Sequence, residues 1–427
     1  MFALTLTIAA AAALACEEAY EPPCGQTDHE VVISEPAVGG GDSIELQRSR
    51  DRVIATWPVR ELKVSPDAGP PSLSLTAFGV AVLDAAGDVV QRRTVTAPSA
   101  LRSRLGSVEQ PGVSIEDGAA LVHWTERSIA TDPDGRIRTT ATLNVAYEGS
   151  DAVLSPPGAA CEMCTIHVSF ASLGDETIAF LRMGAESVSF GTLGGSATTR
   201  FPGFRFRRDG TVAILDTSWL VLPRPILPPP PGFESEAPTA GVSLSVDHEG
   251  RLALRTDGYA WLLNREGLPL HGPVALPAAK ASIAWGPSGD ASIAWTAAGE
   301  LGSRDLFIGL VPAGARTFTA RERVSTGDVV QGADRRGEEV GLAFESLGRT
   351  FFAIADSTGK KRGGDLLLEQ RPAVAQRASA TTGELPAVQT ESASIVIASG
   401  AGRFTFLRGG AGISAGTLSR SKVSCAR

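Results

Sequence analysis

The chain has 427 residues, of which 39 are basic and 47 acidic, so that its formal net charge at pH 7 is −8. Apolar residues make up 43% of the sequence, which is enough for a packed core and excludes a disordered or collagen-like chain. The acidic balance gives no electrostatic reason to bind DNA or RNA, and we therefore expect no nucleic-acid partner.

Residues 1–15 have the pattern of a signal peptide. The segment from Phe2 to Ala15 is uncharged and rich in Ala and Leu. Its fourteen residues would rise only about 21 Å as a helix, too little to cross a bilayer core of roughly 30 Å. Such a segment is typical of the apolar region of a secretory signal rather than of a transmembrane anchor. We therefore expect an exported protein.

Cys16 follows Ala13-Leu14-Ala15 directly. Small residues before a Cys resemble the lipobox of bacterial lipoproteins, in which the Cys thiol is acylated and becomes the mature N-terminus. The resemblance implies lipidation at Cys16 and attachment to a membrane through the lipid. The residues that follow are Glu rather than the Asp that resembles an inner-membrane retention signal, which favours the outer membrane. Ala13 stands where the family usually has Leu, and the alternative is ordinary cleavage after Ala15 with release of a secreted protein.

Four cysteines remain if Cys16 carries lipid, and four can pair completely in an oxidising compartment. Cys161 and Cys164 are expected to bridge locally, which leaves Cys24 to pair with Cys425 and tie the ends of the mature chain together. Three other uses of the Cys161/Cys164 pair are disfavoured because the sequence around it does not meet their requirements. A c-type haem site would need His after Cys164, a redox pair would need to lie at the start of a helix, and a zinc site would need a second pair of ligands. We expect structural disulfides, and neither a metal nor a cofactor.

The body of the chain has the pattern of an all-β fold. Short Val/Ile/Leu/Phe runs alternate with Gly-containing turns, and no long helical periodicity appears after the signal. The clearest repeat is residues 281–285, copied at residues 291–295 across a Pro/Gly turn at 286–290, which predicts a β-hairpin. Similar turn-then-strand units recur, and eight can be counted between Val53 and Ile395.

A second turn, which begins with Asp or Asn and ends with Gly, occurs at Asp84–Gly87, Asn264–Gly267 and Asp356–Gly359. Each unit then contains four strands, and a four-stranded unit that repeats roughly every 40 to 50 residues is typical of a β-propeller blade. We expect a single propeller over residues 43–427. The hairpin count predicts eight blades, with seven as an alternative because the units at Ile178 and Val212 are unusually close. Two stacked β-sandwiches are the alternative fold.

A propeller has to close its ring, and the two ends of the chain indicate how. Residues 387–389, 394–398 and 403–407 offer three strands of the last unit, and Glu30–Ser34 near the mature N-terminus can supply the fourth. That pairing would cover an open sheet edge, and a bridge between Cys24 and Cys425 would lock the same seam. We therefore assign residues 16–42 to the lipid attachment, a tether and the closing strand.

Two long loops, at residues 65–72 and 126–138, are expected on the same face of the propeller as the Cys161/Cys164 pair. Function tends to occur on decorated loops that a rigid scaffold holds, although Pro-, Gly- and Asp-rich insertions can also simply be tolerated. The candidate binding residues are Asp67, Glu126, Arg127, Asp132, Asp134, Arg136 and Arg138.

Catalytic motifs are missing from the sequence. None of the five histidines falls in a His-x-x-x-His or His-Glu-x-x-His pair, and no Gly-x-Ser-x-Gly elbow or Walker loop occurs. We therefore predict no catalytic residues, and expect a binding or scaffold propeller for a protein, a glycan or another extracytoplasmic ligand. One alternative is a propeller hydrolase or lyase with carboxylates at the central channel. A second is a structural envelope lipoprotein without a specific ligand.

Overall fold

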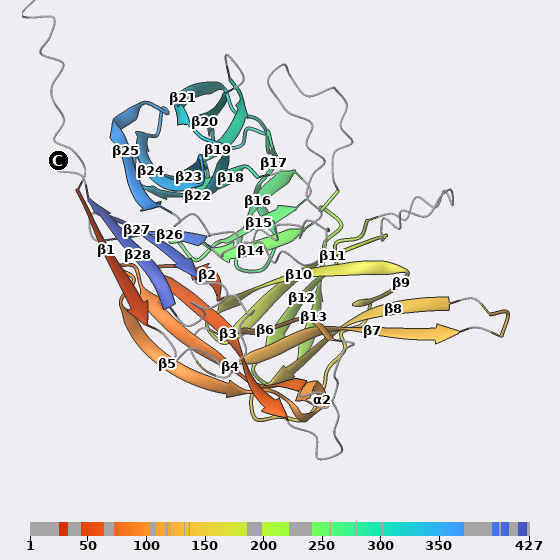
Figure 1. Cartoon of the computed structure of the whole chain (residues 1–427). Helices are drawn as coiled ribbons and strands as arrows, with labels where there is room; N and C mark the ends of the chain where they lie inside the picture. Colours follow the sequence, from red (N-terminus) through yellow and green to blue (C-terminus); the bar gives the residue numbers. More distant parts are fainter. Residues whose placement is uncertain are drawn as a thin grey trace, which may run out of the picture.

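The structure is a computed structural model that describes residues 25–32, 44–63, 72–102, 108–115, 118, 120–131, 133–135, 137–185, 199–221, 241–256, 258–278, 280–299, 303–370, 395–400, 403–409 and 417–424. These residues are almost all in strands, with one short helix, α2 (Ser99–Arg102). The strands pair into antiparallel groups of four, and the all-β propeller predicted from the sequence is confirmed (Figure 1).

Within the described residues, the strands form five separate four-stranded sheets and one eight-stranded sheet, whose two antiparallel halves are joined by a single parallel bridge between Ser49 and Val246. We call the resulting seven groups of four strands blades 1 to 7. Blade 1 contains β2 (Glu45–Ser49), β3 (Arg52–Lys63), β4 (Ser72–Asp84) and β5 (Val89–Thr96); blade 2 contains β6 (Val108–Ser114), β7 (Leu121–Thr131), β8 (Ile137–Tyr147) and β9 (Ala160–Glu162); blade 3 contains β10 (Cys164–Leu173), β11 (Glu176–Ala185), β12 (Gly203–Arg207) and β13 (Val212–Leu215). Blade 4 contains β14 (Val242–Val246), β15 (Leu252–Thr256), β16 (Tyr259–Leu263) and β17 (Pro269–Ala275); blade 5 contains β18 (Ser282–Trp285), β19 (Ala291–Ala298), β20 (Arg304–Val311) and β21 (Ala320–Thr326). Blade 6 contains β22 (Val329–Arg336), β23 (Glu339–Ser346), β24 (Arg349–Asp356) and β25 (Lys361–Gln370); blade 7 contains β26 (Ile395–Gly400), β27 (Arg403–Gly409), β28 (Thr417–Ser424) and β1 (Gly25–Val32).

The hairpin count had predicted eight blades, and the described strands account for seven. The difference lies in the two closely spaced units at Ile178 and Val212. Ile178 is on β11 and Val212 is on β13, and both strands belong to the sheet of blade 3. The turn before Val212 joins the third and fourth strands of that blade, where the sequence had suggested the first hairpin of a new one.

The core consists of apolar clusters between successive blades. Phe78 of blade 1 shares one cluster with Trp124 of blade 2, and Phe180 of blade 3 shares another with Trp261 of blade 4. Comparable clusters join blades 2 and 3, 4 and 5, 5 and 6, and 6 and 7. Leu407 of blade 7 packs in the same way with Val53 of blade 1, so that the last blade contacts the first.

The N-terminal strand β1 lies along the outer edge of the last blade. It pairs antiparallel with β28 over its whole length, from Gly25 opposite Ser424 to Val32 opposite Thr417. The strand predicted at Glu30–Ser34 therefore begins earlier, at Gly25, and residues 33–34 lie outside the described residues. β28 was not predicted, because polar residues at 419–422 interrupt its apolar pattern.

The predicted hairpin and tight turns are confirmed. Ile283 of β18 pairs with Ile293 of β19, and the Gly286 N–H donates to the Asp290 carbonyl across the turn at 2.7 Å. In the second kind of turn, the Gly87 N–H donates to the Asp84 carbonyl at 2.9 Å, and Gly87 has a φ of 76°. This left-handed conformation is accessible to Gly at no steric cost, which explains why Gly ends the motif.

We predict that Cys24 and Cys425 are bonded to each other. Both residues lie outside the described part, but their chain neighbours Gly25 and Ser424 are partners in the β1–β28 register. Peptide mapping of the mature protein under non-reducing conditions should recover one peptide pair that contains both residues. Recovery of free thiols at both positions would contradict the prediction.

Candidate functional site

Several sequence-predicted site residues lie outside the described part of the structure. They are the lipidation candidate Cys16, the cysteines Cys24 and Cys425, and the loop residues Asp67, Asp132 and Arg136. The others are described and lie in blade 2 or at its junction with blade 3.

The segment from Glu126 to Arg138, predicted as a long loop, is for the most part a continuation of the β7–β8 hairpin. Glu126 pairs with Thr142, and the ladder runs on to Thr131 opposite Ile137. Alternating Thr, Ile and Ala residues in this segment suit a strand, and the Asp/Pro/Gly signals belong only to the turn at its tip. The hairpin reaches beyond the neighbouring blades (Figure 1).

Neighbouring charged residues at the start of this hairpin point to opposite faces of β7. Arg127 Nε donates to Glu109 Oε1 at 3.0 Å, whereas Glu126 lies on the opposite face of β7. Arg138 and Glu162 are 3.7 Å apart, and both side chains are more than half exposed, so their ion pair contributes little to stability.

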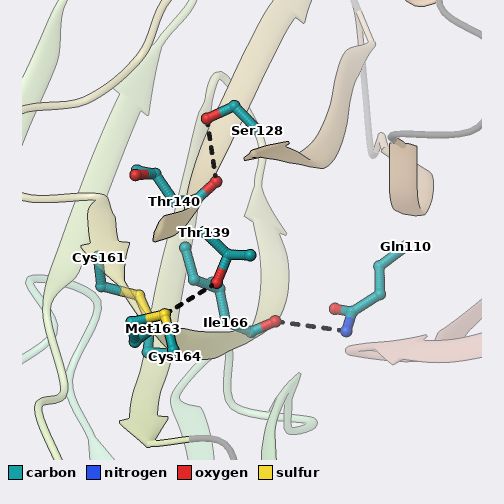
Figure 2. Close-up of a disulfide and its surroundings, with 8 residues drawn as sticks. All are labelled: Gln110, Ser128, Thr139, Thr140, Cys161, Met163, Cys164 and Ile166. Atoms are coloured by element: carbon teal, nitrogen blue, oxygen red, sulfur yellow. Dashed lines mark hydrogen bonds between the residues drawn. A yellow bond between two sulfur atoms is a disulfide. The ribbon is translucent and has the colours of Figure 1, made fainter. Parts of the chain in front are cut away.

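Cys161 and Cys164 form a disulfide at the junction of β9 and β10, with their Cα atoms 5.9 Å apart (Figure 2). The Thr139 hydroxyl donates to the sulfur of Met163, the residue before Cys164, at 3.4 Å. Gln110 Nε2 donates to the Ile166 carbonyl at 3.3 Å. The bridge thus helps to fix the path of the chain from blade 2 to blade 3.

A cavity of about 720 Å³ lies between the inner strands of the blades and forms the central channel. The first strand of every blade contributes to its wall, namely β2, β6, β10, β14, β18, β22 and β26. β2 and β14 come closest, through a parallel bridge between Ser49 and Val246, and lie side by side near the middle of the molecule (Figure 1). The channel is of the size usual for small-molecule sites.

Ionisable and hydroxyl groups lie between apolar residues on the channel wall. Glu45 is accessible from the channel, and burial among the surrounding walls raises the pKa of its carboxyl. Burial lowers the pKa of Arg255 in the same wall. Ser243, Ser282 and the amide of Gln331 add neutral donors and acceptors. The channel can therefore bind polar and charged groups.

At the end where the inner strands finish, five residues form what we call the cross-channel network: Arg48, Asp51, His248, Asp334 and Ser399. Arg48 forms an ion pair with Asp334 and a hydrogen-bonding contact with His248. His248 Nδ1 lies 2.8 Å from Asp51 Oδ1, and its Nε2 lies 2.9 Å from Ser399 Oγ. These residues come from blades 1, 4, 6 and 7, so the network ties four blades together across the axis.

The network stabilises its own charged forms. Hydrogen bonding to Asp334 raises the pKa of His248, against the opposing effects of burial and Arg48. Burial alone would raise the pKa of Asp334, but Arg48 and His248 outweigh it and hold that pKa below its usual value. His248 therefore stays protonated to a higher pH than a free histidine does.

Another histidine on the channel wall behaves differently. His123 of β7 is stacked on Phe170 with ring centroids 3.9 Å apart. Burial lowers the pKa of His123 to about 3, so that the ring is neutral at physiological pH. It acts as a packed aromatic residue.

Two further properties of the described residues concern groups that could bind a metal ion and helices that could span a membrane. No group of three or more His, Cys, Asp or Glu side chains among them is arranged to hold a metal ion. Within the same residues, no helix is long and apolar enough to cross a membrane.

No family model matches the chain, and the search of curated proteins found no match either. Among solved structures, the chain is similar to polysaccharide lyase Uly1, with 11% identity and a TM-score of 0.36 over 92% of this chain and 91% of that one. It is also similar to the PQQ-bound aldose sugar dehydrogenase of Streptomyces coelicolor, with 12% identity and a TM-score of 0.31 over 95% and 100% of the two chains. The β-propeller domain of the Trilobed protease of Pyrococcus furiosus has 11% identity and a TM-score of 0.25 over 75% and 97%. Likeness at this level transfers no ligand or activity to this chain.

We predict that replacing His248 destabilises the protein more at pH 5.5 than at pH 8.5. The folded-state pKa of His248 is raised, so its contribution is fully present below the unfolded value of about 6.5 and is lost as the pH rises through the folded value. His248→Gln should lower the free energy of unfolding by about 1 kcal/mol at the lower pH. Urea denaturation at both pH values measures this, with His271→Gln on the outer strand β17 as the matched control. An equal loss at both pH values would contradict it.

Proposed function

We propose that this protein is a binding propeller of the bacterial cell envelope. The propeller is the scaffold, the central channel is the ligand site, and a lipid on Cys16 attaches the chain to the outer membrane. The ligand is a small polar molecule, or the polar end of a larger protein or glycan partner.

The anchor is inferred from the sequence around Cys16, an apolar segment followed by small residues and then Cys. The cysteine count supports it, because lipid on Cys16 leaves four cysteines that can pair completely. We expect labelling by an alkyne fatty-acid probe to be lost in Cys16→Ala and the protein to move to the soluble fraction. Unchanged labelling and fractionation would argue against the anchor.

The observation that carries the binding function is the polar lining of the channel. A cavity of about 720 Å³ in which Glu45, Arg255, Gln331 and several serines lie among apolar residues has the composition of a ligand site. The cross-channel network lies at the end of the channel where the first strands turn into the second strands. The β7–β8 hairpin joins the second and third strands of blade 2 and therefore lies toward the opposite end, where we propose that a ligand enters.

One observation favours the hydrolase or lyase alternative. Glu45 has a raised pKa and is accessible from the channel, which suits a general acid or base. Asp334 and Asp247, the buried carboxylates that also line the channel, are each held by basic partners, Asp334 by Arg48 and His248, and Asp247 by Arg251. With a single available carboxylate identified, we retain binding as the principal function and turnover as the second candidate.

The channel can be tested by filling it. Ser243 lines the channel on β14, and Ser243→Trp would occupy part of its volume. In a thermal-shift screen of amino acids, dicarboxylates, hexoses and short peptides, we expect at least one compound to raise the melting temperature of the parent protein. A site at 100 times its Kd stabilises by about 2.7 kcal/mol, which corresponds to a shift of several degrees. The shift should disappear in Ser243→Trp.

The control is Val90→Trp on the outer strand β5, where the side chain is 58% exposed and far from the channel. This variant should retain the ligand-induced shift. Mass spectrometry of the recovered compound shows whether the protein binds it unchanged or converts it to a product. Conversion by the parent protein that is lost in Glu45→Gln would favour the hydrolase or lyase alternative. An equal shift in Ser243→Trp and the parent protein would reject the channel as the site, and no shift with any compound would favour a purely structural role.

A further inference from the structure

A second cavity, of about 410 Å³, lies on the face of blade 2 that packs toward blade 1. Its polar lining comes from Glu126, Ser128, Thr142, Asn144 and Ser155. None of these residues lines the central channel, so this inter-blade pocket is a separate site.

Strand geometry gathers these side chains. Glu126 and Ser128 alternate with Trp124 along β7 and therefore share one face of the sheet. On β8, Asn144 is the register partner of Trp124, and Thr142 is the partner of Glu126, which places both on that same face. The antiparallel register thus brings a carboxylate, an amide and hydroxyls to one side of the hairpin.

Hydrogen bonds hold the polar groups in place. Asn144 is only 6% exposed, and its Nδ2 donates to Glu126 Oε2 at 3.2 Å. The Ser155 hydroxyl donates to Asn144 Oδ1 at 2.6 Å. A buried amide therefore fixes both a carboxylate and a hydroxyl at the pocket wall, and neither needs to reorganise when a ligand arrives.

Hydrophobic surface completes the pocket. Ala100 of α2 and Val153 line it, and Trp124, 1% exposed, contributes an aromatic ring. The Trp124 Nε1–H has no hydrogen-bond partner among the described residues. The pocket therefore combines apolar patches with hydrogen-bonding groups over a volume at the lower end of the range for small-molecule sites.

The chemistry of this lining selects a ligand class. Glu126 repels anions, and as the one carboxylate in the described lining it provides too few ligands for a metal ion. Hydroxyls, an amide and a carboxylate match groups that both donate and accept hydrogen bonds, and the apolar patches match C–H faces. We propose that the inter-blade pocket binds a neutral polyhydroxylated ligand of monosaccharide size, either free or as the terminal residue of a glycan.

The full mature chain tests this by isothermal titration with glucose, galactose, mannose and N-acetylglucosamine, and by binding to an array of immobilised glycans. We expect saturable binding to at least one free sugar or terminal residue. Glu126→Gln keeps the shape but removes the charge that strengthens hydrogen bonds from sugar hydroxyls, and should weaken binding about tenfold. Ala100→Trp fills the pocket and should abolish binding.

Two controls separate this pocket from other effects. Glu109→Gln makes the same chemical change on the adjacent strand β6, outside the pocket, and should leave sugar binding unchanged. Ser243→Trp blocks the channel and should also leave it unchanged, so a failed channel proposal would not remove this one. The inference is overturned if no sugar binds in solution or on the array, or if binding is the same in the parent protein, Glu126→Gln and Ala100→Trp. Circular dichroism confirms folding, and Glu126→Gln keeps the test valid if Ala100→Trp does not fold.

Discussion

Each blade of this protein is a four-stranded sheet with two apolar faces, and neither face can be buried within the blade itself. Burial against the neighbouring blade on each side is the constraint on which the rest of the structure depends. A cluster of apolar side chains buries these faces at each interface between successive blades, and Leu407 packs with Val53 between the last blade and the first. Pairing of β1 with β28 adds backbone hydrogen bonds at the edge of the last blade.

Packing the blades side by side brings their first strands around a common axis, where a channel of about 720 Å³ remains between them. Polar residues lie among apolar ones along its wall. Gln47 Nε2 donates to the Leu244 carbonyl at 3.2 Å across the axis, and Arg48 joins Asp334 and His248 close by. Because a buried charge is tolerated only when it is paired, these residues form a connected network at one end of the channel. The remaining channel keeps the volume and polarity of a ligand site.

Local signals in the sequence predicted local structure well. The copied segment around Ile283 and Ile293 formed the expected hairpin, and Gly87 ends a turn as its motif required. The sequence patterns led to wrong predictions where one motif fits more than one position in a blade. Asp209-Gly210 marks a turn between third and fourth strands as readily as between first and second, and the polar strand β28 has no apolar pattern to reveal it. Glu126 was identified as a site residue, but from a presumed loop, and its partner Asn144 was missed because a strand Asn gives no sequence signal.

By itself, the sequence determined the all-β class, the turns and the local Cys161–Cys164 bridge, since each depends on residues close together in the chain. Only the tertiary structure decided the grouping of strands into blades and the composition of both cavities. Arg48, His248 and Asp334 are separated by 200 and 86 positions along the chain, yet they meet because ring packing brings three inner-strand ends to one axis. No periodicity or spacing encodes such a meeting, because it follows from the burial of blade faces elsewhere in the molecule.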